Sequence, residues 1–281
     1  MLEYGKLRGM RSIRLPLSTP IVQAPLGVCD GPWLAGAVSR AGGLGTLTLS
    51  APSLEATRVR LVRLRGYTTR PVLMALTAEW EKERVLELCL EHGFRHFQVF
   101  WWNGMRQVRR IHAGGGLSLW QVGTLDQVDE ALSQGADALI LQSTQAGGPV
   151  RSPHTLEELV PQVRALVGAD FPVIAGGGLA TKEDISRTLE LGASAAFLGT
   201  RFLLTREASA PLAHKHRLLQ AQTQQLTLDT RLVGQWPCSP RRRLGTATLP
   251  DVPSLYAGEG LSRIHGLPSA AEVVRRLSAG L

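Results

Sequence analysis

The chain has 281 residues, of which 44% are hydrophobic and 19% charged, and its formal net charge is +8. This apolar fraction is large enough for an extensive core, which excludes a disordered chain. No apolar run approaches the ~18 residues of a membrane-spanning helix, and three scattered cysteines exclude a disulfide framework and a zinc motif. The N-terminus intersperses basic residues among apolar ones and lacks the apolar stretch of a signal peptide, so we expect a cytoplasmic protein.

The positive charge comes almost entirely from arginine, because lysine supplies only 4 of the 31 basic residues. A charge of this sign attracts phosphates without sequence preference. The arginines are spread along the chain, apart from one cluster at Arg241–Arg243, and no nucleic-acid-binding motif accompanies them. We therefore interpret the charge as a property of a solvated surface and expect neither a specific nucleic-acid partner nor a membrane partner.

Short apolar runs alternate with helical patterns from residue 20 to residue 202. Most of the runs are continuously apolar, as is typical of parallel strands buried on both faces. Eight runs are predicted to be strands: Pro20–Pro25, Gly45–Leu49, Pro71–Thr77, His96–Trp102, Leu117–Gly123, Asp137–Ser143, Phe171–Gly178 and Ala195–Phe202.

The segments between these runs carry signals for helix ends. Pro32 suits the first turn of a helix that ends before Gly42, and Thr124 can cap a helix over residues 125–134. Thr181 and Asp184 form a capping-box pattern at the start of another helix, which Gly192 closes.

Eight strand–helix repeats of this length predict an α/β fold of the TIM (β/α)₈ barrel type, with an open doubly wound sheet as the alternative. We expect one domain, with the barrel over about residues 20–205 and a C-terminal helical and loop extension over about 206–281. Residues 208–225 are predicted to contain the last barrel helix, and residues 237–253 to be mostly loop.

Glycines gather at the ends of the last three predicted strands, in Gln142–Gly148, Gly176–Gly178 and Phe197–Thr200. Glycine lets the backbone approach a ligand closely, so that bare N–H groups can point at phosphate oxygens. The loops after the last strands of such barrels often bind phosphate. The pattern predicts a phosphate site, with tight turns as the structural alternative.

Several of these segments together resemble the nitronate monooxygenase (2-nitropropane dioxygenase) family, which also includes flavin-dependent enoyl reductases. The resemblance covers about residues 21–243. It is carried, in chain order, by Ile21–Pro25, Leu34–Leu44, Trp120–Thr124, Gln142–Gly148, Pro172–Leu179, Phe197–Phe202, Lys215–Ala221 and Arg241–Leu244. It implies a TIM barrel that binds FMN non-covalently.

The resemblance also implies which residues contact the cofactor. Three backbone positions would lie against the flavin ring, Gln142 would hydrogen-bond the flavin or its ribityl chain, and the glycines and Thr200 would surround the phosphate. The implied cofactor-binding set is Ala24, Pro25, Leu26, Gln142, Gly147, Gly177, Gly178, Gly199 and Thr200, and no metal is expected.

Three positions depart from the family pattern, and one of them is Ala75, which aligns with the family's flavin-contacting asparagine near the end of the third strand. The family signature ends in a Glu-Ala-Gly-Gly-His sequence, whose histidine is the base of the family, whereas this chain has Gln145 and Pro149 at the acidic and histidine positions. Proline has no ionisable group, so the catalytic residues stay unknown. His154, five residues further along the same predicted loop, has a suitable intrinsic pKa for a base, with an exposed loop histidine as the alternative.

Three functions remain open on this basis. The first is an FMN-dependent oxidoreductase that oxidises nitronates or related small molecules, which needs no base if the substrate arrives ionised. The second is an enoyl reductase with NAD(P)H as donor and a thioester or acyl carrier as acceptor. The third is a catalytically degenerate flavin-binding protein.

Overall fold

The structure is a computed structural model, and it describes residues 14–50, 53–76, 82–99, 105–231, 239–245 and 255–281. Eight parallel strands form one sheet in the order β1-β9-β8-β6-β5-β4-β3-β2. The strands are β1 (Ile21–Gln23), β2 (Gly45–Leu49), β3 (Val72–Leu76), β4 (His96–Val99), β5 (Leu117–Val122), β6 (Ala138–Gln142), β8 (Val173–Gly176) and β9 (Ala195–Leu198). All eight predicted strands are present.

The sheet closes on itself through its first two strands. Val22 and Leu44 form a parallel bridge next to the start of β2. The Gln23 N–H donates to the Leu44 carbonyl and the Leu44 N–H to the Ile21 carbonyl, each at 2.9 Å. This closure confirms the predicted TIM barrel over the open doubly wound sheet.

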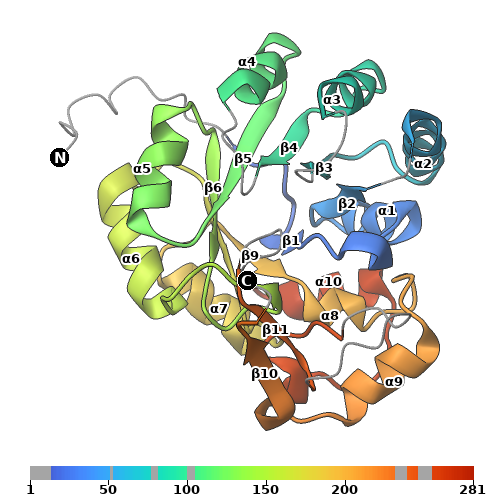
Figure 1. Ribbon diagram of the computed structural model, residues 1–281, viewed down its shortest axis with the longest axis vertical. Helices are drawn as coiled ribbons and strands as arrows, with labels where there is room; N and C mark the ends of the chain where they lie inside the picture. Colours follow the sequence, from blue (N-terminus) through green and yellow to red (C-terminus); the bar gives the residue numbers. More distant parts are fainter. Residues whose placement is uncertain (1–13, 51–52, 77–81, 100–104, 232–238, 246–254) are drawn as a thin grey trace.

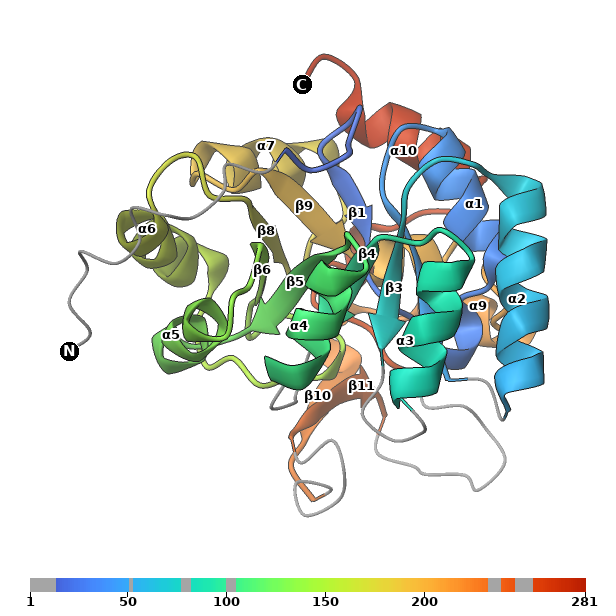
Figure 2. The ribbon, with the colours of Figure 1, turned by 90° about the horizontal axis from the view of Figure 1, so that it is seen from above.

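Among the described residues, the helices α1 to α7 surround the strands (Figures 1 and 2). They are α1 (Pro32–Arg40), α2 (Leu54–Tyr67), α3 (Lys82–Glu91), α4 (Met105–Ala113), α5 (Leu125–Ser133), α6 (Leu156–Val167) and α7 (Lys182–Glu190). The predicted caps are confirmed: Pro32 opens α1, the Thr124 hydroxyl accepts from the Gln127 N–H, and Thr181 forms the capping box with Asp184. Apolar residues on alternate strand positions fill either the barrel interior or the layer under these helices.

The eighth helix of the outer ring comes from a place that the pattern did not predict. The helix after β9, α8 (Thr200–Leu203), has only four residues, so the predicted strand 195–202 ends at Leu198. Helix α10 (Ala270–Ser278) contacts both α1 and α7 and shares an apolar cluster with β1. It therefore occupies the position expected of the last barrel helix, whereas α9 (Leu212–Gln220) covers only part of the predicted segment 208–225.

A second, three-stranded antiparallel sheet lies at the carboxyl ends of the barrel strands (Figure 2). It consists of β7 (Gly148–Pro149), β10 (Leu226–Asp229) and β11 (Arg241–Leu244). Part of the segment predicted as loop is thus a strand, because its backbone pairs with β7 and β10. The remaining short elements are the 3₁₀ turns η2 (Gly27–Cys29), η3 (Thr223–Gln225) and η4 (Leu261–Arg263).

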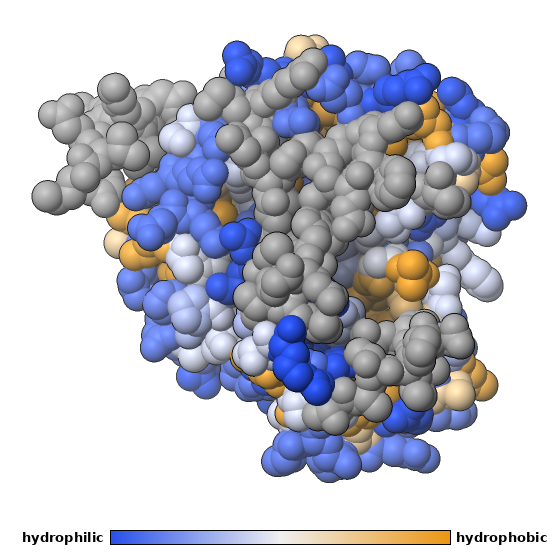
Figure 3. All heavy atoms as spheres, viewed as in Figure 1, coloured by the Kyte–Doolittle hydropathy of each residue, from blue (hydrophilic) through white to orange (hydrophobic). Residues whose placement is uncertain are grey.

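The exposed surface agrees with a solvated arginine-rich coat. On the face drawn in Figure 3, hydrophilic residues predominate and hydrophobic ones form small separate groups. Among the helices of the described residues, none is long and apolar enough to cross a membrane.

Candidate active site

A cavity of about 540 Å³ opens at the carboxyl ends of the barrel strands. Its walls come from the segments after β1, β6, β8 and β9 and from the C-terminal part of the chain. The structure brings together in this cavity all nine residues that the family resemblance implies for the cofactor: Ala24, Pro25, Leu26, Gln142, Gly147, Gly177, Gly178, Gly199 and Thr200.

Two glycines of the cavity wall allow close backbone contact between the barrel loops and the C-terminal segment. A Cβ atom at Gly147 would lie 2.5 Å from the Ala257 carbonyl carbon and 2.6 Å from the Gly258 nitrogen. A Cβ atom at Gly260 would lie 2.3 Å from the Gly178 carbonyl oxygen. Because real Cβ atoms do not approach so closely, only glycine fits at these two crossings. The C-terminal segment is therefore part of the cavity wall.

Backbone donors at the ends of β8 and β9 have no acceptor among the residues that the structure describes. The N–H groups of Gly177, Gly178, Gly199 and Thr200 donate no hydrogen bond to any of the described residues. All four residues are half-buried and line the cavity. Unpaired N–H groups in such a place are costly unless a ligand accepts from them. Four such groups at the ends of the adjacent strands β8 and β9 can serve the oxygens of a phosphate.

Thr200 adds a hydroxyl to these donors. Its Oγ1 accepts a hydrogen bond from the Gly258 N–H at 2.9 Å. A hydroxyl that accepts in this way still has its own proton to donate, and Thr200 faces the cavity. The chemistry of this donor set therefore fits the phosphate group of FMN, because it supplies hydrogen bonds without burying a second charged side chain.

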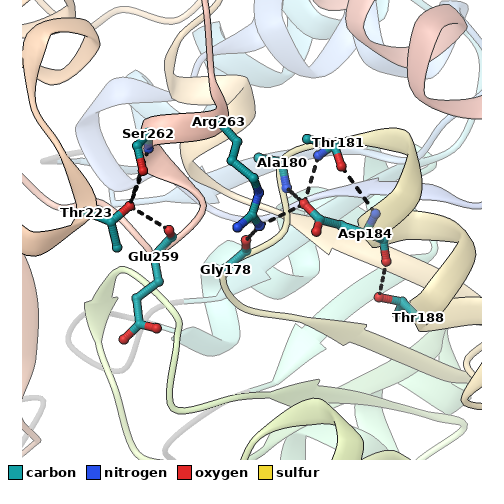
Figure 4. A network of polar contacts seen from close by, with 9 residues as sticks. All are labelled: Gly178, Ala180, Thr181, Asp184, Thr188, Thr223, Glu259, Ser262 and Arg263. Carbon is teal, nitrogen blue, oxygen red and sulfur yellow. Dashed lines mark hydrogen bonds and ion pairs between the residues drawn. The ribbon is translucent and has the colours of Figure 1, made fainter.

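A polar network outside the cavity fixes the Gly178 loop (Figure 4). The Arg263 guanidinium donates to the Gly178 carbonyl at 2.7 Å and to the Asp184 carboxylate at 2.9 Å. The same carboxylate accepts from the Ala180 and Thr181 N–H groups at 2.7 and 2.9 Å. Arg263 thus joins the C-terminal segment to the start of α7 and holds the carbonyl side of Gly178 away from the cavity.

The wall beside Gly199 is an apolar loop that a buried carboxylate holds in place. Asp30 accepts from the Leu26 N–H at 2.8 Å, from the Thr48 N–H at 2.9 Å and from the Thr48 hydroxyl. Burial raises the pKa of Asp30 to about 6, although these hydrogen bonds and the nearby Arg60 oppose that rise. The carboxylate thereby closes the turn that presents Leu26 and η2 to the cavity.

Gln142 lines the cavity, but its amide is already used within the protein. Its Nε2 donates to the Pro149 carbonyl at 3.0 Å and its Oε1 accepts from the Arg151 N–H at 3.1 Å. The implied hydrogen bond to flavin therefore has to compete with these two bonds. Gln121, which the sequence analysis did not single out, is better placed to donate. Its Oε1 accepts from the buried Gln98 at 2.6 Å, which leaves its Nε2 for the cavity.

The candidate base His154 lies outside the residues that line the cavity. Its Nδ1 is 3.9 Å from the exposed Glu158 carboxylate. Its side chain is 41% exposed. Pro149 itself does line the cavity, in β7. The structure therefore separates His154 from the residues with which it was expected to act.

Three further side chains line the cavity and were missed by the sequence analysis: His214, Arg241 and Tyr256. His214 is 6% exposed, and neither ring nitrogen has a hydrogen-bond partner in the part of the chain that the structure describes. Burial lowers its pKa, and Arg217 lowers it further, so the imidazole is neutral at pH 7. No local motif marks these residues, because the α9, β11 and 255–260 segments reach the cavity only through tertiary contacts. Among the described residues there is no cluster of His, Cys, Asp and Glu that could hold a metal ion.

Comparisons with known proteins place the chain in a family. The profile of the nitronate monooxygenase family matches residues 99–238. A nitronate monooxygenase of Pseudomonas aeruginosa is 28% identical, with 94% of this chain and 96% of that protein covered. A (3aS,4S,5R,7aS)-5-hydroxy-7a-methyl-1-oxo-octahydro-1H-indene-4-carboxyl-CoA dehydrogenase of Mycobacterium tuberculosis is 30% identical, with 97% of this chain and 75% of that protein covered. The solved structure of nitroalkane oxidase from Streptomyces ansochromogenes has a TM-score of 0.81 at 27% identity, covering 94% of this chain and 96% of that one.

The closed parallel barrel and the donor-lined cavity at its carboxyl end define a TIM-barrel protein with a ligand site in the position usual for enzymes of this fold. The similarity in sequence extends over nearly the whole chain. The chain belongs to the nitronate monooxygenase family and is an oxidoreductase.

Proposed function

We propose that this chain is an FMN-dependent oxidoreductase that oxidises nitronates or related small molecules. One observation supports the cofactor assignment: the backbone N–H groups of four residues that line one cavity, Gly177, Gly178, Gly199 and Thr200, have no acceptor among the described residues. They would hold the FMN phosphate together with the Thr200 hydroxyl. When bound, the flavin supplies the electron-transfer chemistry that side chains lack.

The chain's own residues orient the reactants and exclude water. The backbone and apolar side chains of Ala24, Pro25 and Leu26 would form the wall against the flavin ring, and Gln121 would donate from β5. Pro149 offers no proton acceptor in β7, and His154 lies outside the cavity. A substrate that arrives already ionised needs no proton removal, which favours a nitronate over a neutral nitroalkane.

A second candidate is reduction of an activated alkene, such as an enoyl thioester, with NAD(P)H as the hydride donor. It is favoured by one specific observation, the 30% identity to a dehydrogenase that acts on a carboxyl-CoA compound. Its substrate would be an acyl thioester of a carrier, and the arginine-rich surface would favour phosphate-bearing partners. A catalytically degenerate flavin-binding protein is the third outcome of the test below. In each case we propose small-molecule partners and a cytoplasmic protein with reduced cysteines.

Anaerobic reduction of the FMN-loaded protein separates these functions. A yellow protein with the flavin absorption bands, or one that takes up FMN stoichiometrically, supports the cofactor assignment. Bleaching by ethyl nitronate without NAD(P)H supports the first function, and bleaching by NAD(P)H followed by reoxidation with an enoyl thioester supports the second. A yellow protein that neither reagent bleaches is degenerate, and a protein that never binds FMN refutes the proposal.

A further inference from the structure

His214 lines the cavity as a buried side chain whose ring nitrogens find no hydrogen-bond partner among the described residues. A buried polar atom without a partner costs free energy, and in native proteins such atoms usually have a functional reason. The two ring nitrogens of one imidazole both lack a partner here. Because the ring is part of the cavity wall, a ligand in the cavity can supply the missing bond.

The position of His214 on α9 gives it apolar surroundings. His214 and Leu218 are both buried and lie four residues apart, so they share one face of the helix. Leu218 belongs to an apolar cluster with Cys29 of η2, Leu203 of α8 and Leu261 of η4. This face of α9 is therefore directed at η2, α8 and η4, which offer the imidazole mainly apolar contacts.

Two sets of hydrogen bonds fix the start of α9 in this place. The buried Lys215 ammonium donates to the Thr205 carbonyl at 2.6 Å and to the Ala208 carbonyl at 2.7 Å. The Ser209 N–H donates to the Cys29 carbonyl at 2.8 Å. These bonds join the beginning of α9 to the end of α8 and to η2, so the imidazole is held at the cavity by a rigid support.

The elements around His214 also border the phosphate end of the cavity. Thr200 and Leu203 lie three residues apart on α8, and both line the cavity. Gly258, whose N–H donates to the Thr200 hydroxyl at 2.9 Å, comes three positions before Leu261 of η4. Helix α9 contacts η4. The wall that carries His214 is thus adjacent to Thr200 on two sides.

We propose that His214 donates a hydrogen bond to the phosphate of FMN, beside the Thr200 hydroxyl and the backbone N–H groups at the ends of β8 and β9. The bond needs no charge on the ring, because a neutral imidazole carries one N–H. This inference rests on the proposed function, since it assigns a side-chain contact to the proposed cofactor. It predicts a contribution to the binding of the phosphate and none to the binding of the flavin ring.

The test compares FMN with riboflavin, which has the same ring and ribityl chain but no phosphate. His214→Phe keeps a ring of similar size and removes the N–H, and His214→Gln keeps a donor. The matched control is His216→Phe, because His216 is exposed on the same helix. Fluorescence titration gives the Kd of each ligand, phosphorus NMR reports on the phosphate of bound FMN, and circular dichroism checks the fold.

We expect His214→Phe to raise the Kd for FMN by about 10- to 100-fold, because a hydrogen bond to a charged group is lost. The Kd for riboflavin should change by less than about threefold. His214→Gln should lie between His214→Phe and wild type, and His216→Phe should match wild type. The phosphorus resonance of bound FMN should shift in His214→Phe alone. If His214→Phe does not fold, His214→Leu against His214→Gln gives the same comparison.

Equal losses for FMN and riboflavin would overturn the inference and would assign the ring to the flavin or the ribityl chain. An unchanged Kd for FMN with an unshifted phosphorus resonance would also overturn it. The proposed function fails in a different way. A folded wild-type protein that binds neither FMN nor riboflavin refutes the cofactor assignment, whereas a wild type that binds FMN, with variants that lose nothing, refutes only the role of His214.

Discussion

Gly199 offers the sharpest test of the phosphate site, because a side chain fits there without disturbing the fold. Its φ of −99° is open to any residue. A Cβ atom at this position would meet only Ala24 Cβ at 3.7 Å and Leu26 Cδ2 at 3.9 Å, which are ordinary contacts. Gly199→Asp should therefore fold, and its carboxylate would project into the space where the phosphate is expected.

The size of the effect follows from Coulomb's law. Two unit charges about 5 Å apart at an effective dielectric constant of about 20 repel by roughly 3 kcal/mol. A phosphate monoester carries about 1.5–2 charges at pH 7, so the repulsion amounts to about 5–6 kcal/mol. Since each 1.4 kcal/mol is a factor of ten, FMN affinity should fall by about 10⁴-fold.

Fluorescence titration with FMN measures this loss, and thermal melting followed by circular dichroism checks that each variant is folded. Gly199→Asn is the matched control, because it has nearly the same volume and no charge. It should lose far less affinity than Gly199→Asp. If the two variants bind FMN within tenfold of one another while both are folded, the phosphate does not lie at Gly199 and the cavity assignment is wrong.

Three other predictions concern stability and the proton acceptor. Gly177→Ala should destabilise the protein by about 1–3 kcal/mol, because φ is +129° there and the new Cβ would lie 2.2 Å from the Ser143 hydroxyl oxygen. The control is Gly66→Ala in α2, where the new Cβ would meet open space, and it should be neutral or stabilising by up to about 1 kcal/mol. Urea unfolding measures the free energy of unfolding of both variants. The folded-state pKa of Asp30 is raised to about 6, above its unfolded value, so between about pH 6 and 4 the folded state holds a proton that the unfolded state has lost. The free energy of unfolding of wild type minus that of Asp30→Asn should therefore increase as the pH falls from 7.5 to 5. A difference that does not change with pH would contradict this. His154→Ala should leave kcat/KM and its pH profile unchanged, since the ring faces Glu158 outside the cavity, and a lost inflection would restore His154 as a base.

The barrel could be predicted from the sequence because its strands are buried on both faces. A run such as Gly45–Leu49 is continuously apolar or small, and the strand in the structure has these same bounds. The nine implied cofactor positions lie together because every one of them follows a strand at the carboxyl end, apart from Gln142, which ends one. Chain order and strand polarity alone are enough to bring such residues together.

The small sheet and the final helix could not be predicted in the same way. Arg241–Leu244 has the composition of a solvated surface, and it is a strand only because Gly148–Pro149 and Leu226–Asp229 offer backbone partners. Helix α10 has an ordinary amphipathic pattern, which predicts a helix but does not predict that this helix packs against α1. The sequence analysis did not place Arg241 in the cavity wall, because the strand that carries it could not be predicted.

The crossings at Gly147 and Gly260 also bear on when the protein can take up its ligand during its own synthesis. All eight barrel strands have left the ribosome once residue 198 has emerged, yet the wall still lacks Gly258, which is bonded to the Thr200 hydroxyl across 58 positions of sequence. A nascent chain halted before that point would carry a barrel without a complete cofactor pocket. Flavin capture would then follow the synthesis of residues 258–260, and a frameshift or nonsense lesion before them would yield a colourless protein even where the barrel strands persist.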